Sequence, residues 1–160
     1  MSETFTGGCQ CGAVRYRFTE RPSGAHICHC RMCQKAFGGF YAPLVGGPRE
    51  TFEITRGTLA TFNSSAQTER GFCAQCGTPL TFRYLDGQHM SVSIGSLDDP
   101  SVFPPIDQHG VESRLPWAND LGHLPDRPTT EAEDPGNAAS IKASNRQHPD
   151  HDTAIWPEPN

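Results

Sequence analysis

The stretch GGCQCG, residues 7–12, sets two cysteines one residue apart and follows them with a glycine. A matching stretch, CAQCGTP at residues 73–79, carries two more cysteines and a glycine directly after them. Thiolates accept hydrogen bonds from backbone N–H groups, and a glycine lets the chain turn back beneath the sulfur without a Cβ clash. Two such turns facing each other supply four thiolates, the tetrahedral set of a closed structural zinc site. We call these residues the quartet: Cys9, Cys11, Cys73 and Cys76.

A metal ion at the quartet would tie the start of the chain to its middle, which matters in a small domain with a thin core. Two other interpretations are open. The sulfurs could be buried structural thiols, although buried lone cysteines do not usually come in pairs that a glycine follows. A tetrathiolate also suits iron, so a rubredoxin-like iron site competes with zinc. We expect a structural zinc ion.

A second cluster, CHCRMC at residues 28–33, places three cysteines and one histidine in six positions. We call Cys28, Cys30 and Cys33 the trio. Structural zinc is nearly always closed by four protein ligands, whereas catalytic zinc keeps one position open. We therefore expect the trio to hold a second zinc ion, catalytic or labile, whose fourth ligand comes from outside. A small molecule that carries a thiol is an obvious candidate.

Several alternatives could close or replace an open trio site. His26 or His29 could complete a plain structural site, although the ring of His29, between two ligands, would tend to point away from their shared metal. His109 could approach from a distant strand. Two of the three cysteines could instead form a disulfide and act as a redox switch. We favour the open or labile metal site and place the redox switch second.

Composition limits the classes of function. The net charge of −5 offers no basic face for nucleic acid and no attraction to an anionic membrane surface. No apolar stretch approaches the roughly 20 residues that a membrane span needs, and the first residues, MSETFTGG, lack the pattern of a secretory signal. We expect a cytoplasmic protein. There, seven cysteines, an odd number, indicate metal binding or catalysis in preference to disulfides.

Alternating side chains and glycine punctuation predict an all-β fold. Residues 12–18 alternate apolar side chains with arginines, as a half-buried strand does. Residues 80–97 predict a hairpin around Asp86-Gly87. Further strands are expected near residues 40–45, 51–55 and 57–62. With 35% hydrophobic residues, 16 glycines and 14 prolines, such a fold is rich in turns and held by more than its core.

The character of the chain changes near residue 126. From residue 127 to residue 160 the sequence is polar, without periodicity, and has almost no large apolar residue before Ile155 and Trp156. Such a segment buries too little surface to offset the entropy of ordering it. We predict a zinc-binding domain over residues 1–126 and a disordered polar tail over residues 127–160. His148 and His151 in the tail are weak candidates for a metal.

The cysteine motifs and their surroundings resemble a known family, the glutathione-dependent formaldehyde-activating enzymes. The matching pieces are GGCQCGAVRY, CHCRMCQKAFGG, RGFCAQCGTPL, VSIGSLDDP and HGVESRLPW, in the order of the family and over roughly residues 5–125. The resemblance implies a β-tent, an architecture of folded antiparallel sheets stapled by a four-cysteine zinc site. It also implies that the quartet holds the structural zinc, and that the trio holds the second zinc, where glutathione binds.

The reaction that the resemblance implies is the condensation of glutathione with formaldehyde to S-hydroxymethylglutathione, counted among carbon–sulfur lyases. Zinc at the trio would bind the thiol and lower its pKa, and the thiolate would then attack the aldehyde. Three anionic sulfurs already overcompensate the two charges of zinc, so a fourth thiolate would be weakly held and reactive. The competing class is a non-catalytic zinc module that binds a protein partner or a metal.

Residues next to the trio are candidates for contact with the substrate. Lys35 and Arg31 could meet the carboxylates of glutathione, or simply be solvent-exposed charges in a loop. Gly38 and Gly39 could let a ligand approach the backbone closely, or simply serve a turn. We assign Lys35, Gly38 and Gly39 to substrate binding as expectations.

Overall fold

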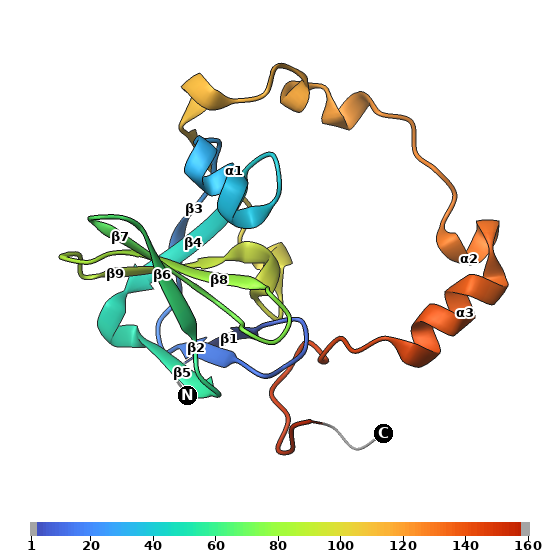
Figure 1. Cartoon of the computed structure of the whole chain (residues 1–160), viewed down its shortest axis with the longest axis horizontal. Helices are drawn as coiled ribbons and strands as arrows, with labels where there is room; N and C mark the ends of the chain where they lie inside the picture. Colours follow the sequence, from blue (N-terminus) through green and yellow to red (C-terminus); the bar gives the residue numbers. More distant parts are fainter. Residues whose placement is uncertain (1–2, 158–160) are drawn as a thin grey trace.

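The computed structural model describes residues 3–157 and arranges them mainly as two β-sheets (Figure 1). The smaller sheet is antiparallel, with the order β1-β2-β5. The larger sheet has the order β10-β3-β4-β9-β8-β7-β6, and only its pair β10–β3 is parallel. The strands are β1 (Phe5–Gly8), β2 (Arg15–Phe18), β3 (Ser23–Cys28), β4 (Ala42–Pro48), β5 (Phe52–Arg56), β6 (Ala60–Ser65), β7 (Thr68–Phe72), β8 (Pro79–Tyr84), β9 (His89–Ser93) and β10 (Asp107–His109).

Helices are short and lie between or after the strands. No helix within residues 3–157 is long and apolar enough to cross a membrane. The α-helices are α1 (Arg31–Phe37), α2 (Thr130–Glu133) and α3 (Pro135–Ser144). The 3₁₀ turns are η1 (Arg49–Thr51), η2 (Ile94–Ser96), η3 (Pro100–Val102), η4 (Val111–Ser113), η5 (Pro116–Asn119) and η6 (Leu121–His123). The expectation of a mainly β fold with antiparallel sheets is confirmed.

Most of the predicted strands are present with shifted ends. Strand β2 lies within the range 12–18, and β8 and β9 form the hairpin expected over residues 80–97. Strands β4 and β5 match the ranges 40–45 and 51–55 to within a few residues, while β6 begins three residues later than expected, at Ala60. Helix α1 was not predicted, because its seven residues make only about two turns before the glycines at its end.

The main core fills the space between the sheets. Tyr16 and Phe18 of β2 are fully buried and pack against Phe52 of β5, with ring centroids 5.6 and 5.1 Å from its ring. Burying each of these rings contributes about 2 kcal/mol. Cys9 and Cys73 belong to this main core. The trio belongs to a separate, smaller cluster around Ala42 and Leu44.

The segment after residue 126 contacts the first quartet loop and β2 near its end. Helices α2 and α3 stand away from the sheets, and the chain then returns towards the smaller sheet (Figure 1). There the indole Nε1 of Trp156 donates to the carbonyl of Cys11 at 2.7 Å, and the N–H of His148 donates to the carbonyl of Gln10 at 2.7 Å. Asp152 pairs with Arg15 at 2.8 Å. An indole, a backbone N–H and a carboxylate near the end of a polar segment make these contacts. The division at residue 126 stays a prediction.

Candidate metal centres and thiol site

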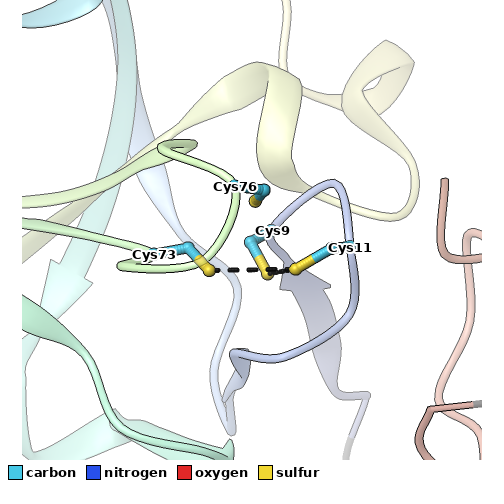
Figure 2. A group of neighbouring side chains, drawn as sticks. All are labelled: Cys9, Cys11, Cys73 and Cys76. Atoms are coloured by element: carbon cyan, nitrogen blue, oxygen red, sulfur yellow. Dashed lines mark hydrogen bonds between the residues drawn. The ribbon is translucent and has the colours of Figure 1, made fainter. Parts of the chain in front are cut away.

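The quartet converges from two loops, one after β1 and one between β7 and β8 (Figure 2). Its four sulfurs lie within 4.8 Å of one another. The Sγ of Cys11 lies 3.6 Å from that of Cys9 and 3.9 Å from that of Cys73. A tetrahedral ion with Zn–S bonds of 2.3 Å has sulfurs about 3.8 Å apart, whereas sulfurs in a disulfide are about 2 Å apart. The quartet therefore fits a tetrahedral metal, and its cysteines are free.

Similar turns hold both halves of the quartet. Gly12 and Gly77 adopt positive φ angles of 76° and 79°, which glycine tolerates best. The N–H of Gly12 donates to the carbonyl of Cys9 at 3.0 Å, and the N–H of Gly77 to that of Cys73 at 2.9 Å. A further bond from the N–H of Gln10 to Thr78 Oγ1, 3.1 Å, joins the two loops. The turn role expected for the two glycines is confirmed.

Burial and hydrogen bonds from backbone N–H groups shift the pKa values of the quartet cysteines in opposite directions. Burial raises the pKa of Cys9 to about 12, although the N–H of Val14 donates to its sulfur at 3.2 Å. Burial also acts to raise the pKa of Cys76, but bonds from Thr78 and from the N–H of Cys11 outweigh it and lower the value to about 6. Neighbouring thiolates repel one another, so four of them need a cation to coexist at neutral pH.

The trio is built where a strand meets a helix. Cys28 ends β3, Cys30 is the N-cap of α1, and Cys33 lies in the first turn of α1. The N–H of Cys33 donates to the sulfur of Cys30 at 3.4 Å. The three sulfurs lie within 4.8 Å of one another, and no other cysteine, histidine or acidic side chain of residues 3–157 joins the group. The trio therefore fits a metal ion with a vacant fourth vertex.

The histidines that could have closed the trio have other partners. The Nε2 of His29 lies 2.9 Å from Gln108 Oε1, and its Nδ1 is buried with no partner among the described residues. Neither ring nitrogen of His29 joins the group of the trio sulfurs. His26 and His109 lie in a different group, with Asp107, at the edge formed by β10 and β3.

A buried arginine that the sequence did not single out contacts the trio. Arg70 of β7 is 5% exposed, and its Nη2 donates to the sulfur of Cys33 at 3.2 Å. Its Nε donates to Ser64 Oγ at 3.2 Å, and the guanidinium carbon lies 4.9 Å from the centre of the Phe82 ring. A hydrogen bond from Cys28 and the guanidinium of Arg70 lower the pKa of Cys33 to about 5, while the shared proton raises that of Cys28.

The predicted substrate contacts lie around the end of α1. Lys35 is exposed in the last turn of this helix, and Gly38 and Gly39 are exposed after it. Gly38 ends α1 with a φ of 62°, and open space surrounds the position of a Cβ there. Arg31 donates to Gln34 Oε1 within the helix. Gly38 thus has a local role in ending the helix, and the side chain of Lys35 is exposed to solvent.

A cavity of about 300 Å³ is lined in part by Arg70, the arginine that contacts the trio. The end of α1 contributes Phe37, and β6 and β7 contribute Phe62 and Phe72. Another wall is formed by Gly77, from the loop that carries Cys73 and Cys76, and by Pro79, at the start of β8. The cavity is mainly apolar, with Arg70 as the only charged residue among those that line it.

The family model of the glutathione-dependent formaldehyde-activating enzyme matches residues 4–112 of the chain. This range includes every cysteine of the quartet and the trio.

Three relatives match about half of the chain. A Halomonas elongata protein named as a candidate glutathione-dependent formaldehyde-activating enzyme is 35% identical over 83 residues, which cover 46% of this chain and 52% of that protein. A Podospora anserina protein with the same name is 30% identical over 95 residues, 55% of this chain and 44% of that protein. A Schizosaccharomyces pombe protein described as an uncharacterised lyase is 27% identical over 89 residues, 53% of this chain and 61% of that protein. The chain thus spans about half the length of the relatives it matches.

A solved structure shares the fold. The crystal structure of a Rhodobacter sphaeroides protein superposes with a TM-score of 0.53 and 19% sequence identity, and the match covers 64% of this chain and 98% of that protein. At this identity the likeness concerns the fold alone.

Proposed function

The chain belongs to the family of glutathione-dependent formaldehyde-activating enzymes, and from this premise we propose that it is a zinc-dependent enzyme of the carbon–sulfur lyase type. Its substrates are a small thiol, glutathione first among them, and an aldehyde such as formaldehyde. The observation that carries the proposal is the trio, in which three sulfurs converge and no fourth protein donor within residues 3–157 joins them. The family's β-tent is the finer architecture that we assign to the two sheets.

We assign different duties to the two cysteine groups. The quartet holds a structural zinc ion, because four sulfurs at tetrahedral spacing leave no vertex for a ligand. The trio holds a second zinc ion, catalytic or labile. When bound there, zinc supplies the positive charge that keeps an incoming thiol deprotonated and the template that orients it.

The protein contributes rigidity and charge to the reaction. Cys28, Cys30 and Cys33 are fixed by the end of β3 and the first turn of α1, so their sulfurs need not reorganise when a thiol arrives. Lys35 binds a carboxylate of glutathione, and the exposed backbone at Gly38 and Gly39 lets the substrate approach.

The chemistry needs no oxidant or reductant. The thiol loses its proton, its sulfur forms a bond to the aldehyde carbon, and the electron pair of the C=O π bond moves to oxygen, which takes up a proton. The other function class, a zinc module without catalysis, is less well supported because a purely structural second site would be closed by a protein ligand.

Exchange NMR of glutathione with formaldehyde tests the proposal, because the uncatalysed condensation makes end-point assays uninformative. We expect the protein to accelerate the exchange between glutathione and S-hydroxymethylglutathione in proportion to its concentration. Cys30→Ser should remove the acceleration, while Cys11 and the rest of the quartet remain intact in that variant. Equal exchange rates with and without the wild-type protein would contradict the enzyme and favour the zinc module.

A further inference from the structure

Arg70 carries a full positive charge into the interior next to the trio. A buried guanidinium that lacks an anionic partner is strongly unfavourable. Its contacts within residues 3–157 are a sulfur of the trio, a hydroxyl and an aromatic ring, and its Nη1 is buried without a partner. No carboxylate forms an ion pair with it in this part of the chain. Arg70 is therefore placed to balance negative charge on the sulfurs.

The net charge of the trio site determines which kind of ligand it accepts. Three thiolates and a divalent ion sum to a net charge of minus one, which disfavours a further anion at the vacant vertex. Arg70, in contact with Cys33, brings the local sum to zero. The affinity of a neutral donor for the site depends little on the charge of Arg70, whereas the affinity of an anionic donor rises with it.

We propose that Arg70 makes the trio site selective for anionic donors, so that it accepts a thiolate in preference to a neutral ligand such as imidazole. The proposal rests on the proposed function only in taking the trio as the place where a thiol binds. Arg70 acts through Cys33 as a positioning residue.

The test uses the full chain loaded with Co²⁺, whose absorption reports the ligands of each ion. The variants are Arg70→Gln, Arg70→Lys and the control Arg83→Gln, which removes an arginine of the adjacent strand that pairs with Glu69. Glutathione, azide as a small anion, and imidazole as a neutral donor are titrated separately. Metal content is measured for each variant.

We expect Arg70→Gln to keep both ions and to bind glutathione and azide roughly tenfold to a hundredfold more weakly, with imidazole affinity unchanged. Arg70→Lys should restore most of the affinity for anions, and Arg83→Gln should match the wild type. Equal azide affinity in Arg70→Gln and the wild type would overturn the inference, as would a parallel loss of imidazole affinity or loss of the trio ion. If Arg70 gives the wild-type protein a higher affinity for azide than for imidazole but the protein does not bind glutathione, the inference stands and the proposed function fails.

A second inference comes from the group of His26, Asp107 and His109. The parallel register sets Asp107 beside His26 and His109 beside Cys28, so all three ligand side chains lie on one face of the sheet. The two imidazole rings stack with centroids 4.4 Å apart, and the ligand atoms lie within 4.8 Å of one another.

The two rings are held differently. The Nε2 of His109 lies 3.2 Å from Oδ1 of Asp107, so a bound cation would take the place of this contact. The Nδ1 of His26 lies 2.8 Å from the carbonyl of Gly24, which can only accept, so in the neutral ring Nδ1 carries the proton and Nε2 the lone pair. Such a bond to the second ring nitrogen is the usual support of a metal-binding histidine. We infer that this group is a third, exchangeable site for a late transition-metal ion such as Ni²⁺ or Zn²⁺, which would staple the edge strand β10 to β3 beside the trio.

Calorimetry with Ni²⁺ tests this site on protein whose quartet and trio are already filled with zinc. We expect one further Ni²⁺ per chain, with a rise in melting temperature because the ion joins two strands. His109→Gln and His26→Gln should each abolish the binding, whereas His89→Gln, an exposed histidine on β9, should not. Unchanged Ni²⁺ binding in both variants would overturn the site, as would its loss in the tail variant His151→Gln.

Discussion

The quartet and the trio place the same side chain in opposite arrangements. The quartet lies in the main core, draws its sulfurs from two distant loops and is supported by backbone N–H groups and a hydroxyl. The trio lies in a smaller cluster, comes from six consecutive residues and is supported by a buried guanidinium. A site that joins distant segments and supplies all four ligands is suited to stabilising the fold. A site built from neighbouring residues, with three protein ligands and a positive charge beside them, is suited to exchanging its fourth ligand.

The largest expected effect comes from opening the quartet. Cys73→Ser removes a fully buried sulfur, so its ion and the link between the two loops should be lost. We expect the free energy of unfolding to fall by several kcal/mol, on the order of what a structural zinc ion contributes to a small domain. Metal analysis and thermal unfolding under reducing conditions measure this. A Cys73→Ser protein with wild-type stability would remove the distinction between the two groups.

The next largest effect is expected at the ion pair between Arg15, the first residue of β2, and Asp98. Arg15 is 3% exposed and meets both carboxylate oxygens of Asp98, at 2.8 and 2.5 Å. Although burial acts to raise the pKa of Asp98, the bonds from Arg15 and Thr6 lower it below its usual value. The pair therefore stabilises the fold above the ordinary carboxyl pKa of about 4, and this contribution is lost as pH falls through the lower folded pKa.

Asp98→Asn should lower the free energy of unfolding at pH 7 by about 3 kcal/mol, and the gap from the wild type should close towards pH 3. The control Glu53→Gln breaks the half-exposed pair with Arg17 and should cost less than about 1 kcal/mol. Urea unfolding of the three proteins from pH 7 to pH 3 gives the comparison. A gap that widens in acid would contradict the sign of the pKa shift.

A smaller effect is expected where the end of the chain covers the quartet loop. Trp156→Phe keeps an aromatic side chain but removes the indole N–H that donates to the carbonyl of Cys11, so stability should fall by about 1 kcal/mol. The rate at which a chelator extracts the quartet ion should rise, and the trio ion should leave as before. If Trp156→Phe accelerates the loss of the trio ion instead, the contact of Trp156 does not protect the quartet ion and the prediction is wrong.

The smallest effect on stability is expected at the trio. Cys28→Ser should change the free energy of unfolding by less than about 1 kcal/mol, because the half-buried Cys28 lies outside the main core. Metal content should drop from two ions to one, and thiol binding should disappear. Global unfolding of Cys28→Ser would show that the trio, like the quartet, is structural.

The sequence is sufficient to predict the grouping of the cysteines, because glycine after a cysteine pair marks a tight turn and short spacing keeps sulfurs together. It is not sufficient for Arg70, since a charged residue in a strand is expected at the surface. Only the pairing of β7 with β8 and the position of α1 bring its guanidinium to Cys33. The short strand β10, with three residues, carries too little pattern to be recognised, so the cluster of His26 with His109 was also beyond prediction.

The end of the chain shows the same limit. A polar composition predicts an unpacked segment, but composition averages over residues. The indole of Trp156 and the backbone N–H of His148 nevertheless make specific bonds to the first quartet loop. Single contacts with distant backbone carbonyls leave no periodic signal in a sequence.

Titration of glutathione into reduced, zinc-loaded protein, followed by calorimetry, tests most directly whether one cysteine group is closed and the other open. The wild type should contain two zinc ions and bind one glutathione, and Cys28→Ser should contain one zinc ion and bind none. No heat at millimolar glutathione, or the same titration in Cys28→Ser as in the wild type, would contradict the account.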